Sequence, residues 1–231
     1  MGIAYNTSMV RNGLVLHLDA ANPKSYPGSG TTWYDLSSGK RNYSFSTGVA
    51  WNSAGYFNFT GGTMTGPASN LFNFFSTVEH TIIAFAKITS QSSNNFFKWT
   101  ATPIVGTDTR AIMTHFPFGG GTFYYDVAGC CGADQRISSA TADDFFIDKI
   151  GMATWRTRKN QTPNRQFFNN LTSVLDSGAN STASVNWNLT DAATIGNGWY
   201  GELYTFIVYN RALTDQELQV NFEAYRGRYG L

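Results

Sequence analysis

The chain has 231 residues, of which 42% are hydrophobic, 16% aromatic and 13% charged, and its formal net charge is +1. This length suits one domain with a large core, and so small a net charge gives no field that attracts nucleic acid or an acidic membrane surface. No apolar run approaches the ~18 residues of a membrane span, so we expect neither nucleic-acid binding nor membrane insertion.

Strand-like segments recur along the chain, separated by clusters of Gly, Asn, Ser and Pro. Leucines alternate with other residues from Gly13 to Asp19, and aromatic residues alternate from Tyr56 to Thr60. Further predicted strands are His80–Ile88, Ala111–Phe116, Thr122–Val127, Ile150–Thr157, Arg165–Asn169 and Tyr200–Tyr209. Because Glu and Lys are few while aromatic and β-branched residues are many, the sequence predicts an all-β fold.

One helix is predicted near the end of the chain. Thr214 and Glu217 have the spacing of a capping box, in which each side chain bonds the backbone of the other residue. Leu218, Phe222 and Tyr225 follow at helical spacing, and Gly227 is a suitable stop. We expect this helix to close one end of the fold.

Several stretches resemble one family along almost the whole chain. They are Gly13–Pro23, Ser25–Trp33, Asp35–Ser37, Phe123–Asp126, Gln135–Ile137, Trp155–Arg158, Gly198–Leu203, Tyr209–Glu217 and Asn221–Leu231. Together they resemble the concanavalin A-like (laminin-G-like) lectin and glucanase domains of the kind found in tailed-phage virion proteins. The resemblance implies a jelly-roll sandwich of two antiparallel sheets with one short C-terminal helix. We expect residues 1–231 to form a single such domain, with residues 1–12 as an N-terminal arm.

The resemblance also implies a function. We expect a virion structural protein, namely a fibre, spike or head-decoration subunit, that displays a lectin-like domain and binds host-surface glycans. Its other expected partners are further virion proteins and copies of itself. The N-terminus shows no signal-peptide pattern, which suits assembly in a host cytoplasm and display on the virion surface. The alternative is a bacterial secreted or surface carbohydrate-binding module.

No catalytic pattern is visible. Glycosidases need two carboxylates flanking the scissile bond, and the glucanase relatives place them in a Glu-x-Asp-x-x-Glu or similar run. Asp143 and Asp144 are adjacent, so a strand would point them to opposite faces, and Asp215 and Glu217 belong to the helix cap. We therefore expect a protein that is not an enzyme.

Aromatic residues beside loops are the candidates for sugar binding, because an exposed ring stacks on a pyranose face. The segment Phe116–Gly121 has the composition of a loop. The candidate ligand-binding residues are Phe116, Phe118, Trp99 and Asp126, with Trp187 as a further aromatic residue beside a loop. The competing interpretation is that these aromatic rings pack in the core or at its rim.

No cofactor is expected, although calcium remains an alternative. Asp126, Asp108 and Asp134 offer oxygen ligands close together in the sequence, without a dense Asp/Asn-Gly loop. The histidines lack the spacing of metal ligands, and we expect structural or surface roles for them. They are His17, His80 and His115.

Two further groups of residues have an expected role. The adjacent Cys130 and Cys131 are expected to be free thiols rather than a vicinal disulfide. A basic cluster is expected on a solvated face around a hairpin, and Arg211 is expected to pair with a carboxylate across the edge of the sandwich. The cluster consists of Arg156, Arg158, Lys159 and Arg165.

Overall fold

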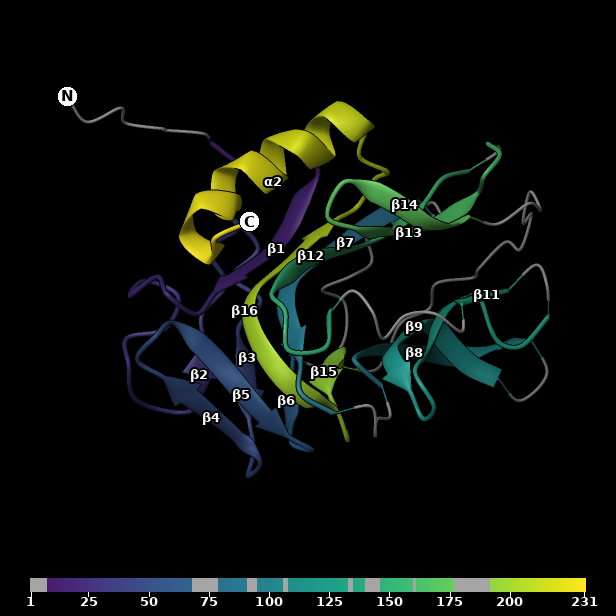
Figure 1. Cartoon of the computed structure of the whole chain (residues 1–231). Coiled ribbons are helices and arrows are strands. Elements are labelled where there is room, and N and C mark those ends of the chain that lie inside the picture. The colour runs from purple at the N-terminus through teal and green to yellow at the C-terminus, as the bar shows by residue number, and fades with distance from the viewer. Residues whose placement is uncertain are drawn as a thin grey trace.

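The fold was analysed in a computed structural model, which describes residues 8–67, 79–90, 95–105, 108–132, 135–139, 146–159, 161–176 and 192–231. Two eight-stranded antiparallel sheets form a sandwich (Figure 1). Sheet A has the order β14 (Thr172–Asp176), β13 (Arg165–Asn169), β12 (Gly151–Thr157), β7 (His80–Ile88), β16 (Tyr200–Tyr209), β5 (Tyr56–Thr60), β4 (Val49–Asn52), and β1 (Leu14–Asp19) also pairs with β16. Sheet B has the order β11 (Arg136–Ser139), β10 (Thr122–Val127), β9 (Asp108–Phe118), β8 (Phe97–Val105), β15 (Thr194–Gly196), β6 (Thr63–Thr65), β3 (Tyr43–Phe45), β2 (Thr32–Trp33). The predicted all-β, two-sheet architecture is confirmed.

Strand β16 organises sheet A because three strands share it. Its first residues pair with β5 and its later residues pair with β1, while β7 follows its other edge from Gly201 to Tyr209. The predicted alternation in β1 holds for Leu16 and Leu18, which lie in the core. A register shift between Leu14 and Leu16 places Leu14 against the outer cluster instead.

Aromatic rings fill the space between the sheets. Phe96 contacts Trp199 with ring centroids 4.8 Å apart, and the Trp199 indole Nε1 donates to the Phe116 carbonyl at 2.6 Å. Rings of this size bury large apolar areas, and the indole N–H finds the acceptor that a buried donor requires. The high aromatic content of the sequence is therefore explained by the core.

The helix α2 (Asp215–Tyr229) has the predicted capping box: Thr214 Oγ1 accepts from Glu217 N, and Glu217 Oε2 accepts from Thr214 N. The predicted stop at Gly227 was wrong, since the helix continues to Tyr229 and Gly230 caps it at φ 71°. Glycine adopts this left-handed conformation without steric cost.

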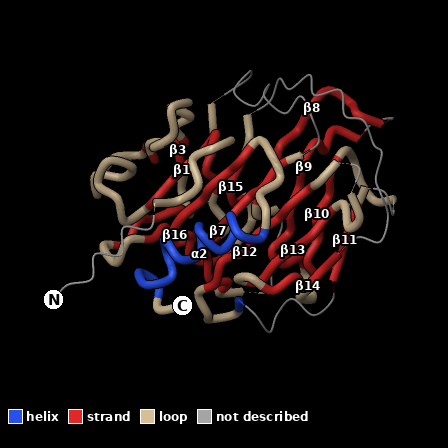
Figure 2. The backbone as a smooth tube through the Cα atoms, turned by 90° about the horizontal axis from the view of Figure 1, so that it is seen from above, coloured by secondary structure: helices blue, strands red, loops and turns tan. Residues whose placement is uncertain are grey.

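The predicted position of the helix was also wrong. Instead of closing an end, α2 lies over the strands of sheet A (Figure 2). Its Leu218 and Tyr225 pack with Phe85, Ile207 and Tyr209 on the outer face of that sheet. Both faces of β7 are consequently buried. Among the described residues, α2 packs on sheet A, and no helix lies over the outer face of sheet B.

Part of the expected N-terminal arm, residues 8–12, lies within the described residues and contacts the rest of the domain. Met9 is buried, the Val10 amide donates to Asn221 Oδ1 at 3.0 Å, and Tyr209 Oη donates to the Val10 carbonyl at 2.9 Å. Met9 and Val10 are therefore packed against α2, whereas Ser8, Arg11 and Asn12 are exposed, and residues 1–7 lie outside the described part. Within the described residues, no helix has the length and apolarity of a membrane span.

Candidate functional site

A row of side chains crosses sheet B from one edge to the other. Paired residues on neighbouring strands project to the same face, and each pairing along the sheet joins one member of the row to the next. We call this set the polar row: Thr32, Ser44, Thr65, Thr194, Lys98, Met113, Asp126 and Arg136. Seven steps of ~4.8 Å between strands give it a length of roughly 34 Å.

The polar row faces outward. The residues next to it along the strands, such as Trp33, Phe97, Ile195 and Val127, belong to the core, and successive side chains of a strand alternate between faces. Ser44 and Thr65 are exposed, and Thr194 and Lys98 are half-buried. One half of the row therefore presents hydroxyls. In the other half, which we call the charged half, Lys98 and Arg136 are half-buried, while Met113 and Asp126 are buried.

The charged half centres on Asp126, whose side chain is fully buried. Arg136 donates to it twice, from Nε at 2.5 Å and from an Nη at 2.6 Å, and an Nη of Arg110 lies 3.7 Å from its Oδ2. The Arg136 guanidinium also lies 4.3 Å above the centroid of the Tyr124 ring. This bidentate, stacked geometry fixes Arg136 on the surface of β10.

Three rings lie beside this charged group. His115 contacts Phe118 and Tyr124 edge to face, with centroid distances of 5.0 and 5.7 Å, and Phe118 contacts Tyr124 at 5.7 Å. Phe118 is 41% exposed, which is unusual for a large apolar ring, while the other two rings support it. We call His115, Phe118 and Tyr124 the aromatic group.

The sequence candidates are only partly brought together. Phe118 and Asp126 lie on the outer face of sheet B, but Asp126 is covered by its arginine partners. Phe116 and Trp99 are in strands and at most 1% exposed, so they are not available as ligand-binding residues, and the competing interpretation that these rings pack in the core holds for both. Strand β9 continues through Phe118, so the turn itself is only Gly119–Gly121. Trp187 lies outside the described residues.

The calcium alternative does not fit the described donors. Both carboxylate oxygens of Asp126 are engaged by Arg136, and a cation beside an arginine is disfavoured. Among the described residues, no group of three His, Cys, Asp or Glu could hold a metal ion. Asp134 and the Asp108 side chain lie outside the described part, as do Asp143 and Asp144.

The histidines have structural roles, as predicted. His17 Nε2 lies 2.7 Å from Tyr225 Oη, and burial lowers the pKa of His17 to about 4. His80 Nε2 lies 2.5 Å from Tyr125 Oη, which also bonds Thr157 and so links the two sheets. His115 belongs to the aromatic group.

Two expectations about charged residues are corrected. Arg156 and Arg165 are at most 3% exposed rather than solvated; Arg156 donates to Gln166 Oε1 and to the Leu213 carbonyl, and it pairs with Asp215. Arg211 pairs with Glu217 of the nearby helix cap rather than across the sandwich edge. Acceptors at the start of α2 and just before it bind these guanidinium groups: Arg156 contacts Asp215 and the Leu213 carbonyl, and Arg211 contacts Glu217. The spacing of the residues in the sequence does not show these pairs.

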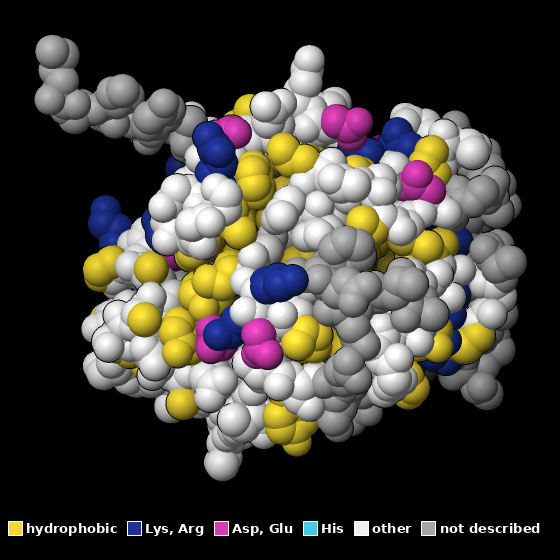
Figure 3. All heavy atoms as spheres, viewed as in Figure 1, with side chains coloured by type: hydrophobic (Ala, Val, Ile, Leu, Met, Phe, Trp, Pro, Cys, Tyr) yellow, Lys and Arg dark blue, Asp and Glu magenta, His cyan; other side chains and the backbone are white. Residues whose placement is uncertain are grey.

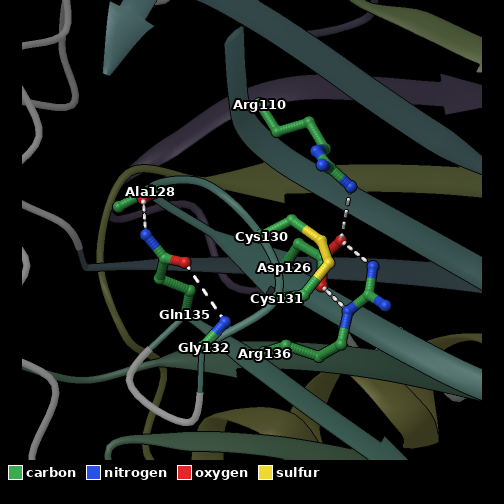
Figure 4. The surroundings of a disulfide bond; sticks show 8 residues. All are labelled: Arg110, Asp126, Ala128, Cys130, Cys131, Gly132, Gln135 and Arg136. Carbon is green, nitrogen blue, oxygen red and sulfur yellow. Dashed lines mark hydrogen bonds and ion pairs between the residues drawn. A yellow bond between two sulfur atoms is a disulfide. The ribbon is translucent and has the colours of Figure 1, made fainter. Parts of the chain in front are cut away.

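The expectation of free thiols is also corrected, because Cys130 and Cys131 form a vicinal disulfide (Figure 4). The pair lies in the turn between β10 and β11, where Ala128 and Gly129 have φ values of 61° and 110°. The turn follows directly on the charged half of the polar row.

Lys98, Thr194, Tyr124 and Arg136 were not singled out from the sequence as site residues. These residues can be identified only from the pairing of strands: Lys98 and Thr194, for example, are opposite each other in the sheet although they are 96 positions apart in the sequence. A single sequence does not contain that register.

Neither a family model nor a curated protein sequence matches the chain. Solved structures do. The chain is similar to Trypanosoma rangeli sialidase in complex with sialic acid, with a TM-score of 0.67, 13% identity, and coverage of 94% of this chain and 33% of that chain. It is also similar to the botulinum neurotoxin serotype D binding domain, with a TM-score of 0.65, 12% identity, and coverage of 93% and 52%. The chain thus spans about a third of the sialidase and about half of the toxin domain. These likenesses confirm the concanavalin A-like fold.

Proposed function

We propose that this concanavalin A-like domain is a non-catalytic glycan-binding module that holds an extended polysaccharide along the polar row. The observation that carries the proposal is the register of sheet B, which aligns hydroxyl and charged side chains from seven of its eight strands along one outer face, with Met113 of β9 among them. Sugar hydroxyls need such donors and acceptors, and the exposed ring of Phe118 offers a stacking face beside them.

The similar structures support binding in general terms only. One sialidase structure holds sialic acid, and the toxin structure is a binding domain. Because this chain matches only a part of each, neither ligand is assigned here. What they support is that a sandwich of this kind belongs to proteins that recognise other molecules.

The absence of catalysis belongs to the same proposal. Glycoside hydrolysis needs two carboxylates about 5–10 Å apart, one of them able to exchange a proton. Within the described part of the polar row the carboxylate is Asp126, and Arg136 engages both of its oxygens. A carboxylate held in this way suits an anchor for an arginine.

For the biological setting, we propose a virion surface component: a fibre, spike or head-decoration subunit that binds host-surface glycans. The resemblance of the sequence to tailed-phage virion domains supports this setting, in which the chain would contact other virion proteins and further copies of itself. Lectin-type sites are shallow, so attachment would come from many copies on one particle. The alternative is a bacterial secreted or surface carbohydrate-binding module, and mass spectrometry of purified virions separates the two settings.

The binding proposal is tested with a multimerised protein on an array of bacterial and host polysaccharides. We expect wild-type protein to bind at least one polysaccharide and Phe118→Ala to weaken that binding about tenfold or more, on the scale of ring stacking. Val220→Ala is the matched control, since Val220 is equally exposed but lies on α2, over the other sheet (41% for both side chains). Binding that Phe118→Ala leaves unchanged contradicts the role of this ring.

A further inference from the structure

The vicinal disulfide lies between the two arginines that flank Asp126. Gly129, immediately before Cys130, donates its amide to the Arg110 carbonyl at 2.7 Å. Gly132, immediately after Cys131, accepts from the Arg136 amide at 2.9 Å. The two residues beside the disulfide are thus the backbone partners of Arg110 and Arg136. Figure 4 shows the disulfide and these two arginines, whose side chains approach Asp126.

Gln135 braces the same turn from inside. Its Nε2 donates to the Ala128 carbonyl at 3.2 Å, and its Oε1 accepts from the Gly132 amide at 3.3 Å. A Cβ at Gly129 would lie 2.8 Å from Gln135 Nε2 and would displace this amide, and φ of 110° is itself a conformation that favours glycine. Gln135, the residue before Arg136, therefore holds both ends of the Ala128–Gly132 segment.

We propose that the Cys130–Cys131 disulfide is a redox-controlled brace that positions the Arg110–Asp126–Arg136 cluster. A cross-link between adjacent residues constrains only the turn, and this turn holds the backbone of both arginines. In the reduced protein the turn gains freedom, and Arg136 loses its fixed bidentate geometry on Asp126. The cysteines are accessible, because Cys131 is exposed and Cys130 is half-buried.

The chemical step is thiol–disulfide exchange with a dithiol. One dithiol thiolate attacks a cysteine sulfur and breaks the Cys130–Cys131 bond, and its second thiolate then closes the dithiol's own disulfide. Two electrons and two protons pass from the dithiol to the protein, which is left with two thiols. The consequence for binding rests on the proposed function: a module braced in this way binds its glycan best in an oxidising environment and more weakly where thiols are kept reduced.

The test follows the Arg136 Nε–H by NMR, without any glycan. We expect its hydrogen exchange to become about tenfold faster when dithiothreitol reduces the protein, and to slow again on reoxidation. The Nε–H of Arg211, which donates to the Asn12 carbonyl at 3.0 Å, is the internal control and is expected to stay unchanged. The Cys130→Ser/Cys131→Ser double variant is expected to exchange fast without reductant and not to respond to it.

Two results would overturn the inference. One is unchanged Arg136 exchange in protein whose two thiols are shown by alkylation and mass spectrometry to be reduced. The other is alkylation of both cysteines in denaturant before any reductant is added. In a separate arm, reduction is expected to weaken polysaccharide binding about tenfold. If no polysaccharide binds even the oxidised protein, the proposed function fails, while the exchange result still decides the redox brace.

Discussion

Tyr225 of α2 and His17 of β1 lie 2.7 Å apart, Oη to Nε2, beneath the helix. Burial raises the pKa of the Tyr225 phenol, so the phenol stays protonated and donates to a neutral imidazole. Burial also lowers the pKa of His17 to about 4 from its ordinary 6.5. The contact between helix and sheet therefore depends on an uncharged histidine.

Stability is consequently expected to fall in acid. The unfolded chain binds a proton at His17 more readily than the folded one does, because the pKa of His17 is lower in the folded chain. The contribution of neutral, buried His17 to the free energy of unfolding is therefore complete above pH 6.5 and is lost as the pH falls from 6.5 towards 4. The loss is at most about 1.4 kcal/mol per pH unit for this one group. Urea unfolding of wild type and His17→Gln across this range checks it. The two free energies of unfolding are expected to converge as the pH falls, whereas parallel profiles would show that His17 is not the group responsible.

Loss of the helix N-cap is expected to cost stability alone. Thr214→Ala removes the bond from Glu217 N to Thr214 Oγ1 and is expected to lower the free energy of unfolding by about 1 kcal/mol. Thr214→Ser keeps the hydroxyl and serves as the control. The urea midpoint measures both, and an unchanged midpoint for Thr214→Ala would contradict the assigned helix start.

The two partners of one ion pair are expected to respond very differently. The Arg156 side chain is 3% exposed and also bonds Gln166 and the Leu213 carbonyl, while the Asp215 side chain is 83% exposed. Arg156→Ala leaves buried acceptors unsatisfied and is expected to cost about 3 kcal/mol, whereas Asp215→Asn is expected to cost less than about 1 kcal/mol. Equal costs in chemical denaturation would show that the ion pair, rather than the buried hydrogen bonds, stabilises this corner.

Hydrolysis is expected to be absent. Incubation with polysaccharides that the protein binds is expected to release no reducing ends, because Arg136 engages both oxygens of Asp126. Turnover that is abolished by changing a single carboxylate would contradict the non-catalytic proposal.

The sequence predicted the helix cap and several of the longer strands well, since these depend on local pattern, but it missed β8, which has nine residues. His80–Ile88, Thr122–Val127, Arg165–Asn169 and Tyr200–Tyr209 match the observed strands end for end. It missed strands of two or three residues, such as Thr32–Trp33 and Thr194–Gly196, because so short a segment shows no period.

The candidate site was much less accessible to sequence reasoning. Phe116 and Phe118 are two positions apart and both apolar, yet one is fully buried and the other 41% exposed. A register shift in the β9–β10 pairing accounts for that difference: Phe118 is opposite Thr122 and His115 is opposite Tyr124, so β9 has one extra residue between them and the alternation of faces is broken. The polar row depends on register between distant segments, which only the folded chain defines.

The surface viewed in Figure 3 shows basic and acidic side chains interspersed with small hydrophobic groups, so charge alone does not mark a site on that face. The central claim concerns the outer face of sheet B, and hydrogen exchange with a bound polysaccharide tests it most directly. The account predicts slower exchange in β8, β10 and β15, which carry Lys98, Asp126 and Thr194, and no change in α2. Protection confined to α2 and the β13–β14 hairpin, with none in sheet B, would contradict it.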